Sequence, residues 1–95
     1  MIVTVRLPGV LRGDTGGAAA VAVDVADGAT VVAVLDALDA VHPRAGWRIR
    51  DEQGLLRRHV NVFVGERNIR DLAGLDTPAA AGGEVTILPA VSGGA

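Results

Sequence analysis

The segment TVVAVLDALDAVH, residues 30–42, is the one long helical pattern in a chain of otherwise strand-like runs. Its apolar residues recur three and four positions apart, which places them on one face of an α-helix: Val31, Val34, Leu35, Leu38 and Val41. Thr30 is of a residue type that favours the position before a first helical turn, and Pro43 is expected to end the run. The pattern predicts an amphipathic helix that must bury this face against another layer.

Strand-like runs lie on both sides of this helix. Alternating patterns occupy residues 1–7 (MIVTVRL), 18–25 (AAAVAVDV), 59–64 (HVNVFV) and 84–89 (EVTILP). The order is thus strand, strand, helix, strand, a short turn and strand. A hairpin that feeds a crossing helix, with the final strand beside the first, is the ubiquitin-like β-grasp arrangement. The sequence therefore predicts an α+β fold, with a mixed four- to five-stranded sheet packed on one main helix.

The second half of the chain is less regular. We expect residues 44–58 (RAGWRIRDEQGLLRR) to form a loop or a short hairpin that turns at Gln53-Gly54. Residues 66–83 suit a loop with room for one helical turn. The glycine-rich RGDTGG, residues 12–17, is expected to connect the first two strands.

Composition excludes several classes of function. The 95 residues suit one domain, and the chain contains neither cysteine nor lysine, so a disulfide, a thiolate nucleophile and a lysine Schiff base are all excluded. A net charge of -2 with only two aromatic residues argues against nucleic-acid binding. No apolar run has the length of a membrane helix, and the first residues lack the features of a signal peptide. We therefore expect a cytoplasmic protein that binds neither nucleic acid nor membrane.

The polar residues offer little catalytic chemistry. Asp36 and Asp39 lie three apart on the expected helix, opposite its apolar stripe, so a solvated surface is a better interpretation than an acid–base pair. His42 and His59 have no third ligand at a recognisable spacing, so no metal site is predicted. The GDTGG run leads into a strand rather than a helix, unlike a phosphate-binding loop. The polar residues therefore predict neither an acid–base pair, nor a metal site, nor a phosphate-binding loop.

The C-terminal residues are the candidate functional site. Pro89 has no N–H for a strand ladder, so the sequence divides into a β-grasp domain, residues 1–89, and a flexible tail, residues 90–95. Two consecutive glycines, Gly93 and Gly94, give a core nothing to pack, but they would let an extended terminus thread a narrow channel. Residues 90–94 would reach roughly 17 Å when fully extended. We expect Val91, Ser92 and Pro89 to contact a partner.

The run ILPAVSGG resembles the C-terminus of the ThiS and MoaD family of ubiquitin-like sulfur carriers, in which a strand ends at proline and a short tail ends in Gly-Gly. The segments VTVRLPGVLRGDTGG, VNVFVGERNIRDL and GGEVTILPAVSGG are most similar to the actinobacterial branch that carries sulfur for cysteine biosynthesis. The likeness covers nearly the whole chain.

This resemblance implies a chemistry for the terminus. An E1-like adenylyltransferase and sulfurtransferase would activate the carboxylate of Gly94 with ATP and magnesium, and a sulfur donor would convert it to a thiocarboxylate. The acceptor would be a cysteine synthase-like enzyme that uses pyridoxal phosphate, and a zinc-dependent JAMM-type peptidase would release the product. The carrier would not itself be an enzyme but a protein substrate of its partner enzymes, and it would bind no cofactor. Acceptors that make molybdopterin or a sulfur-containing secondary metabolite, conjugation as a protein modifier, and a purely noncovalent role remain alternatives.

Ala95 departs from the family pattern, in which the mature carrier ends at glycine. One hypothesis is that a peptidase removes Ala95 before activation. Another is that Ala95 was added in cloning. Activation of alanine itself fits least, because its methyl group would crowd a channel shaped for glycine.

Overall fold

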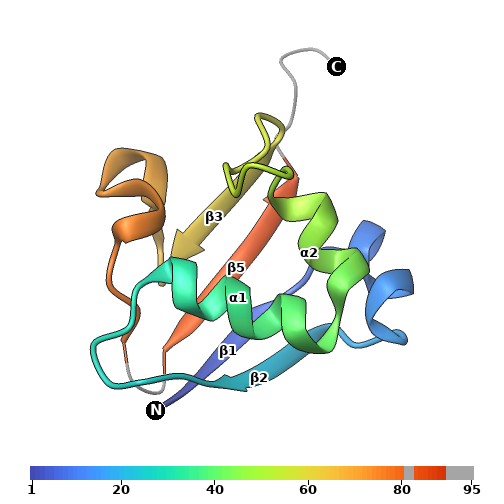
Figure 1. The fold of residues 1–95 in the computed structure, drawn as a ribbon, viewed down its shortest axis with the longest axis horizontal. Coiled ribbons are helices and arrows are strands. Elements are labelled where there is room, and N and C mark those ends of the chain that lie inside the picture. Colours follow the sequence, from blue (N-terminus) through green and yellow to red (C-terminus); the bar gives the residue numbers. More distant parts are fainter. Residues whose placement is uncertain (81–82, 90–95) are drawn as a thin grey trace.

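A computed structural model describes residues 1–80 and 83–89 of the protein (Figure 1). Its elements follow in the order β1 (Ile2–Arg6), η1 (Gly9–Thr15), β2 (Ala20–Asp24), α1 (Val31–Val41), α2 (Pro43–Ile49), β3 (Val60–Val64), β4 (Arg67–Asn68), η2 (Ile69–Asp71), η3 (Gly74–Asp76) and β5 (Glu84–Pro89), where η denotes a 3-10 helix. The five strands form one sheet in the order β2-β1-β5-β3-β4. The predicted β-grasp fold is confirmed.

The sheet is mixed because its central pair runs parallel. β1 pairs with β5 in parallel, with Val5 beside Val85, whereas β2 is antiparallel to β1, and β3 is antiparallel to both β5 and β4. The last strand therefore lies in the middle of the sheet, as expected from its position beside the first. Its bounds, Glu84–Pro89, are those that the alternating pattern predicts.

α1 crosses one face of the sheet and covers it (Figure 1). The strand valines and the isoleucine that point toward this helix are almost fully buried. Four of the five apolar residues predicted on one face of α1 are also buried: Val31, Val34, Leu35 and Leu38. Val41, at the end of the helix, is exposed. The alternating apolar residues of the strands and the helically spaced apolar residues of α1 thus pack together in a single core.

The start of α1 is held by the backbone rather than by a side-chain cap. Thr30 is the residue before the helix, as predicted, but its side chain forms no capping hydrogen bond. Instead the amide of Val31 donates to the carbonyl oxygen of Thr77 at 2.9 Å, and Thr30 forms an isolated bridge with Pro78. The segment after η3 therefore satisfies the first turn of α1.

The expectation of a loop from residue 44 was wrong, because α2 occupies Pro43–Ile49. Pro43 ends α1 but also begins α2, since proline fits the first turn of a helix, where its missing N–H is not needed. The predicted turn at Gln53-Gly54 is present after α2: Arg50 and Leu56 form an antiparallel bridge, and Gly54 has a φ of 80°. The connection between β1 and β2 likewise contains a 3-10 helix, η1, that sequence reasoning missed.

Candidate functional site

Five of the six predicted site residues, Val91, Ser92, Gly93, Gly94 and Ala95, lie outside the described residues, as does the rest of the predicted tail. Pro89 is described, and it is the last residue of β5, in register with Val60 of β3. Strand pairing therefore includes Pro89, the last residue of the predicted strand. β5 ends at Pro89, so along the chain the surface around Pro89 is the described part nearest to the predicted reactive terminus.

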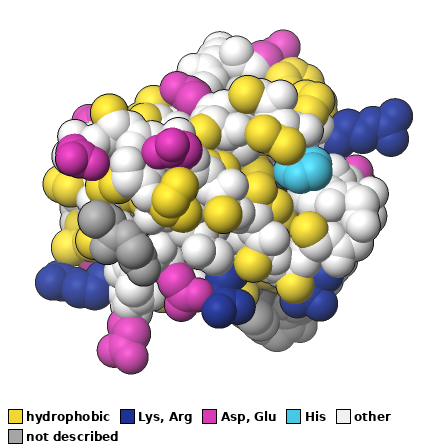
Figure 2. Space-filling view, turned by 90° about the horizontal axis from the view of Figure 1, so that it is seen from below, with side chains coloured by type: hydrophobic (Ala, Val, Ile, Leu, Met, Phe, Trp, Pro, Cys, Tyr) yellow, Lys and Arg dark blue, Asp and Glu magenta, His cyan; other side chains and the backbone are white. Residues whose placement is uncertain are grey.

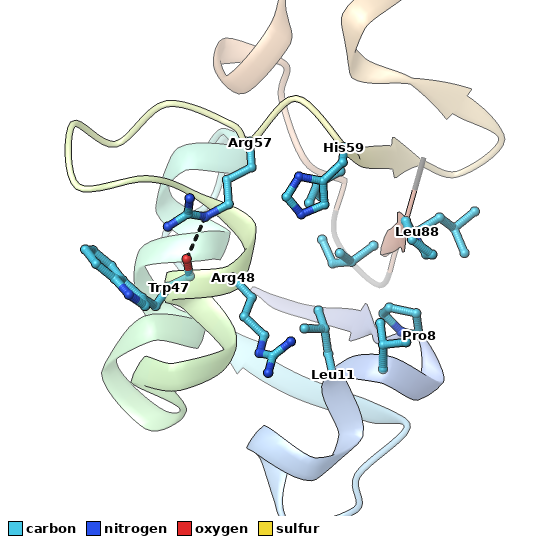
Figure 3. Close-up of a pocket in the computed structure, with 11 residues that line it drawn as sticks. Pro8, Leu11, Trp47, Arg48, Arg57, His59 and Leu88 are labelled. Atoms are coloured by element: carbon cyan, nitrogen blue, oxygen red, sulfur yellow. Dashed lines mark hydrogen bonds between the residues drawn. The ribbon is translucent and has the colours of Figure 1, made fainter. Parts of the chain in front are cut away.

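A cavity of ≈ 260 Å³ opens beside Pro89. Four parts of the chain surround it: η1 with the residue before it, α2, the segment that leads into β3, and the end of β5. Figure 3 shows Pro8 and Leu11 on one side of the cavity, Trp47 and Arg48 on α2, and Arg57 and His59 on the segment before β3. Sequence reasoning did not find this cavity, because its walls come from segments far apart in the chain.

The cavity has an apolar lining and an exposed apolar border. Ile87, Val60 and Leu11 are buried in the core and form part of its wall. Among the described residues, seven large apolar side chains are exposed. Three of them line this cavity: Val10, Trp47 and Leu88. The other four, which do not line it, are Ile2, Val41, Leu55 and Leu72. Exposed apolar surface is thus gathered beside the strand that carries the terminus.

The charged groups that line the cavity are two arginines, Arg48 and Arg57. No aspartate or glutamate is among the described lining residues, although the whole chain has a net charge of -2. Arg48 forms an ion pair at 2.8 Å with Asp14, which lies outside the cavity lining. On the face that Figure 2 shows, by contrast, acidic and basic side chains are interspersed.

Arg57 is fixed in place by α2. Its Nε donates a hydrogen bond to the carbonyl oxygen of Trp47 at 2.9 Å, drawn as a dashed line in Figure 3, and its guanidinium carbon lies 5.6 Å from the centre of the indole ring. The backbone of Arg57 is held as well, because its carbonyl accepts a hydrogen bond from Arg70 at 3.1 Å. Within residues 1–80 and 83–89, no carboxylate forms an ion pair with Arg57. Its charge is therefore oriented and available to an anion from outside.

Asp36 and Asp39 have a role that the sequence did not indicate. Both carboxylates accept hydrogen bonds from Nη2 of Arg50, each at 2.8 Å, and the Arg50 side chain is only 9% exposed. The two aspartates lie on the partly exposed face of α1, as predicted, but they tie α1 to the residue that follows α2. The arrangement is a structural ion-pair cluster, and it does not resemble an acid–base pair because one arginine engages both carboxylates.

Glycine at position 46 makes this cluster possible. A Cβ atom on Gly46 would overlap Oδ1 and Cγ of Asp39 and would lie 3.3 Å from the Asp39 Cα atom. α2 can therefore approach α1 at this point only because residue 46 has no side chain.

The two histidines, His42 and His59, lie in different parts of the structure. His42 lies at the junction of α1 and α2, whereas His59 lines the cavity. In the described part of the chain, no three His, Asp or Glu side chains come together as a metal ion needs. None of the helices described there is long and apolar enough to cross a membrane.

The N-terminus is also held by charge. The ammonium group of Met1 donates to the carbonyl oxygen of Val25 at 2.6 Å and to Oδ1 of Asp24 at 3.3 Å. It also lies 3.4 Å from a carboxylate oxygen of Asp27. The hydrogen bond to the Asp24 side chain, together with the charge of that carboxylate, raises the pKa of the amino group above its usual 8.0. The N-terminus is therefore fastened to the end of β2.

Comparison with known proteins identifies the family. The model described as the ThiS family matches residues 5–94. The chain belongs to the ThiS family. The resemblance drawn from the ILPAVSGG run and the three longer segments is thereby confirmed, and the ThiS family match includes Gly94 but leaves Ala95 outside.

Individual relatives match all or most of the chain. "Sulfur carrier protein CysO" of Mycobacterium tuberculosis is 43% identical over 96 residues, which cover 99% of this chain and 100% of the relative. "Small archaeal modifier protein 1" of Haloferax volcanii is 41% identical over 81 residues, covering 85% of this chain and 88% of that protein. These relatives are named as a carrier and a modifier rather than as enzymes, which agrees with the expectation for this chain.

Solved structures give the same result. The crystal structure of an Amycolatopsis orientalis BexX/CysO complex contains a chain that is 37% identical, with a TM-score of 0.84 over 95% of this chain and 97% of that one. The crystal structure of Mycobacterium tuberculosis CysO is 42% identical, with a TM-score of 0.81 over 94% of this chain and 99% of that chain. The fold and the family therefore agree.

Proposed function

We propose that the protein carries sulfur on its C-terminus as a thiocarboxylate of Gly94 and donates it for cysteine biosynthesis. The single observation that carries this proposal is the 43% identity, over essentially the full length of both chains, with a protein named as the sulfur carrier CysO. The absence of cysteine from the chain is compatible with it, because the sulfur would be held by the backbone terminus and no thiol is required.

The chemistry proceeds in two steps on a partner, an E1-like enzyme. First, a carboxylate oxygen of Gly94 attacks the α-phosphorus of ATP, and magnesium pyrophosphate leaves. Hydrosulfide then attacks the acyl carbon and AMP leaves with the electron pair of the broken C–O bond, so that one oxygen of the carboxylate is replaced by sulfur and the proton of hydrosulfide is released. Gly93 and Gly94 serve by having no side chain to obstruct either attack. Val91, Ser92 and Pro89 contact the partner.

The acceptor enzyme would be of the cysteine synthase type and would supply its own pyridoxal phosphate. A JAMM-type peptidase would then free the carrier. The crystal structure that pairs CysO with BexX contains a chain 37% identical to this one, and it supports a role in which the carrier docks on another protein. An acceptor that makes a secondary metabolite is the alternative within the same chemistry.

We propose that Ala95 is removed before activation. The family match ends at Gly94, so the residue that the chemistry needs at the terminus is the one before the last. With Ala95 in place, the carboxyl carbon to be activated would belong to alanine, which is chiral and has a methyl side chain, instead of to glycine.

The test is intact mass spectrometry after incubation with the E1-like enzyme, ATP, magnesium and sulfide. Three chains are compared: residues 1–95, residues 1–94 and residues 1–93. We expect only the chain that ends at Gly94 to show the exchange of one oxygen for sulfur. Exchange on the 95-residue chain with Ala95 attached would refute the removal step, and exchange on none of the three would refute the carrier function.

Conjugation to other proteins is a second candidate, favoured by the 41% identity with small archaeal modifier protein 1. The chain has no lysine, so it could not build chains on itself through lysine. This function predicts isopeptide-linked adducts of higher mass when the tagged protein is recovered from cell extract under denaturing conditions. A single band at the mass of the carrier would count against it.

A further inference from the structure

We infer that the cavity beside Pro89 is a docking site for the enzyme that activates the terminus, and that this enzyme inserts an apolar side chain bordered by a carboxylate. The inference rests on the proposed function, which requires such an enzyme. The surface where that enzyme would bind is the opening between η1, α2, the segment before β3 and the end of β5.

Position is the first argument. Pro89 lines the cavity and is the last residue of β5, so the tail begins at the edge of the opening. An enzyme that acts on Gly94 works within five residues of Pro89, a reach of roughly 17 Å even in a fully extended chain. A body of protein large enough to hold ATP and grip the tail must therefore cover the surface around this cavity.

Size is the second argument. The volume of ≈ 260 Å³ is below the range of about 300–1,000 Å³ that is usual for small-molecule sites, and the cavity is open to solvent. A space of this size accepts one or two side chains from another protein. Its border of Val10, Trp47 and Leu88 then supplies exposed apolar area that a partner would bury.

Charge is the third argument. Arg57 borders an opening with no acidic lining residue among those described, and its guanidinium is already oriented by the Trp47 carbonyl and ring. An arginine fixed in this way loses little conformational freedom when a carboxylate binds it. The complementary partner surface is thus apolar at its centre and acidic at its edge.

Binding of the full 95-residue chain to the E1-like enzyme, measured by calorimetry, tests this inference. R57E and V10D change the cavity, while R67E and V41D are matched controls on exposed residues that do not line it. We expect the dissociation constant to rise about tenfold for R57E and for V10D, and to stay within about twofold for R67E and V41D. Added salt should weaken the wild-type complex more than the R57E complex.

Trp47 provides an independent readout, because it is the only tryptophan of the chain and lines the cavity. Binding to the enzyme should move its emission to shorter wavelength as the indole leaves water; an enzyme whose tryptophans have been replaced by phenylalanine makes the change readable. No change in Trp47 emission on formation of the complex would contradict docking here.

The outcomes separate this inference from the proposed function. If the 1–94 chain takes up sulfur and both R57E and V10D bind the enzyme as tightly as wild type, the inference is overturned and the carrier function stands. If R57E and V10D weaken binding but the mass experiment shows no sulfur on any chain, the docking surface stands and the carrier function falls. Self-association of the free chain that V10D abolishes would identify a second copy as the occupant and would also overturn the inference.

Discussion

Replacing Gly46 with alanine tests the packing of α2 on α1. The new Cβ would overlap Oδ1 and Cγ of Asp39, so either the Asp39 side chain rotates away from Arg50 or α2 moves off α1. Losing the Asp39–Arg50 contact costs about 1 kcal/mol, since Asp39 is 41% exposed and solvent screens the pair. Displacing well-packed helices costs about 1–3 kcal/mol, and alanine returns about 0.5–1 kcal/mol of helix propensity.

The net expectation is that G46A lowers the free energy of unfolding by about 1–2 kcal/mol. Urea denaturation followed by circular dichroism measures it, with the midpoint and slope compared between variants. G13A is the matched control, because a Cβ on Gly13 meets nothing within 4 Å and no positive φ is required there. We expect G13A to be neutral within about 0.5 kcal/mol.

The decisive comparison places G46A in a D39A background. Removing the Asp39 carboxylate removes the two atoms that the new Cβ would overlap and leaves the Cα atom of residue 39 at 3.3 Å. The cost of G46A should then fall close to zero. An undiminished cost in the D39A background, or a G46A as harmless as G13A, would refute the account of why residue 46 is glycine.

Three further predictions concern stability. L38A should lower the free energy of unfolding by about 3 kcal/mol, because Leu38 is fully buried between α1 and the sheet, and the same urea titration measures it; a loss below about 1 kcal/mol would show that the core collapses around the gap. R50M should cost about 1–2 kcal/mol by leaving both carboxylates unpaired, whereas D36N should cost less because Asp36 is 63% exposed; equal stability of R50M and wild type would contradict this expectation. Because the pKa of the Met1 amino group is raised in the folded protein, its ion pair stabilises the fold fully below about pH 8 and less as the pH rises above it, so the urea midpoint should fall as the pH rises above about 8 in wild type and fall less in D24N.

Local patterns predicted much of the fold because the residues that define each element are neighbours in the chain. The apolar spacing of Val31 to Val41 has the bounds of α1, and EVTILP has those of β5. α2 was missed because Pro43 was interpreted only as a stop, although proline is equally suited to begin a helix and Ala45 and Ile49 stand at helical spacing after it. That spacing was the one sign of the second helix in the sequence.

For the candidate site, too, features made by neighbouring residues could be predicted and features made by distant residues could not. The predicted terminal residues stand in a family pattern of consecutive letters, so sequence could name Gly93 and Gly94 without any geometry. Arg50 between Asp36 and Asp39, and the cavity that joins Arg57 to Val10 and Pro89, depend on the relative placement of helices and strands. No local pattern encodes such contacts, because their members are separated by more than ten residues.

The position of β5 has a mechanical consequence. A partner that draws in the C-terminus applies force to the sheet through Pro89, and β5 has β1 on one side and β3 on the other. A pull along the strand loads the hydrogen bonds to both neighbours together, in shear, instead of breaking them one at a time as in peeling an edge strand. The domain can thus act as a firm anchor while its terminus is threaded, processed and released.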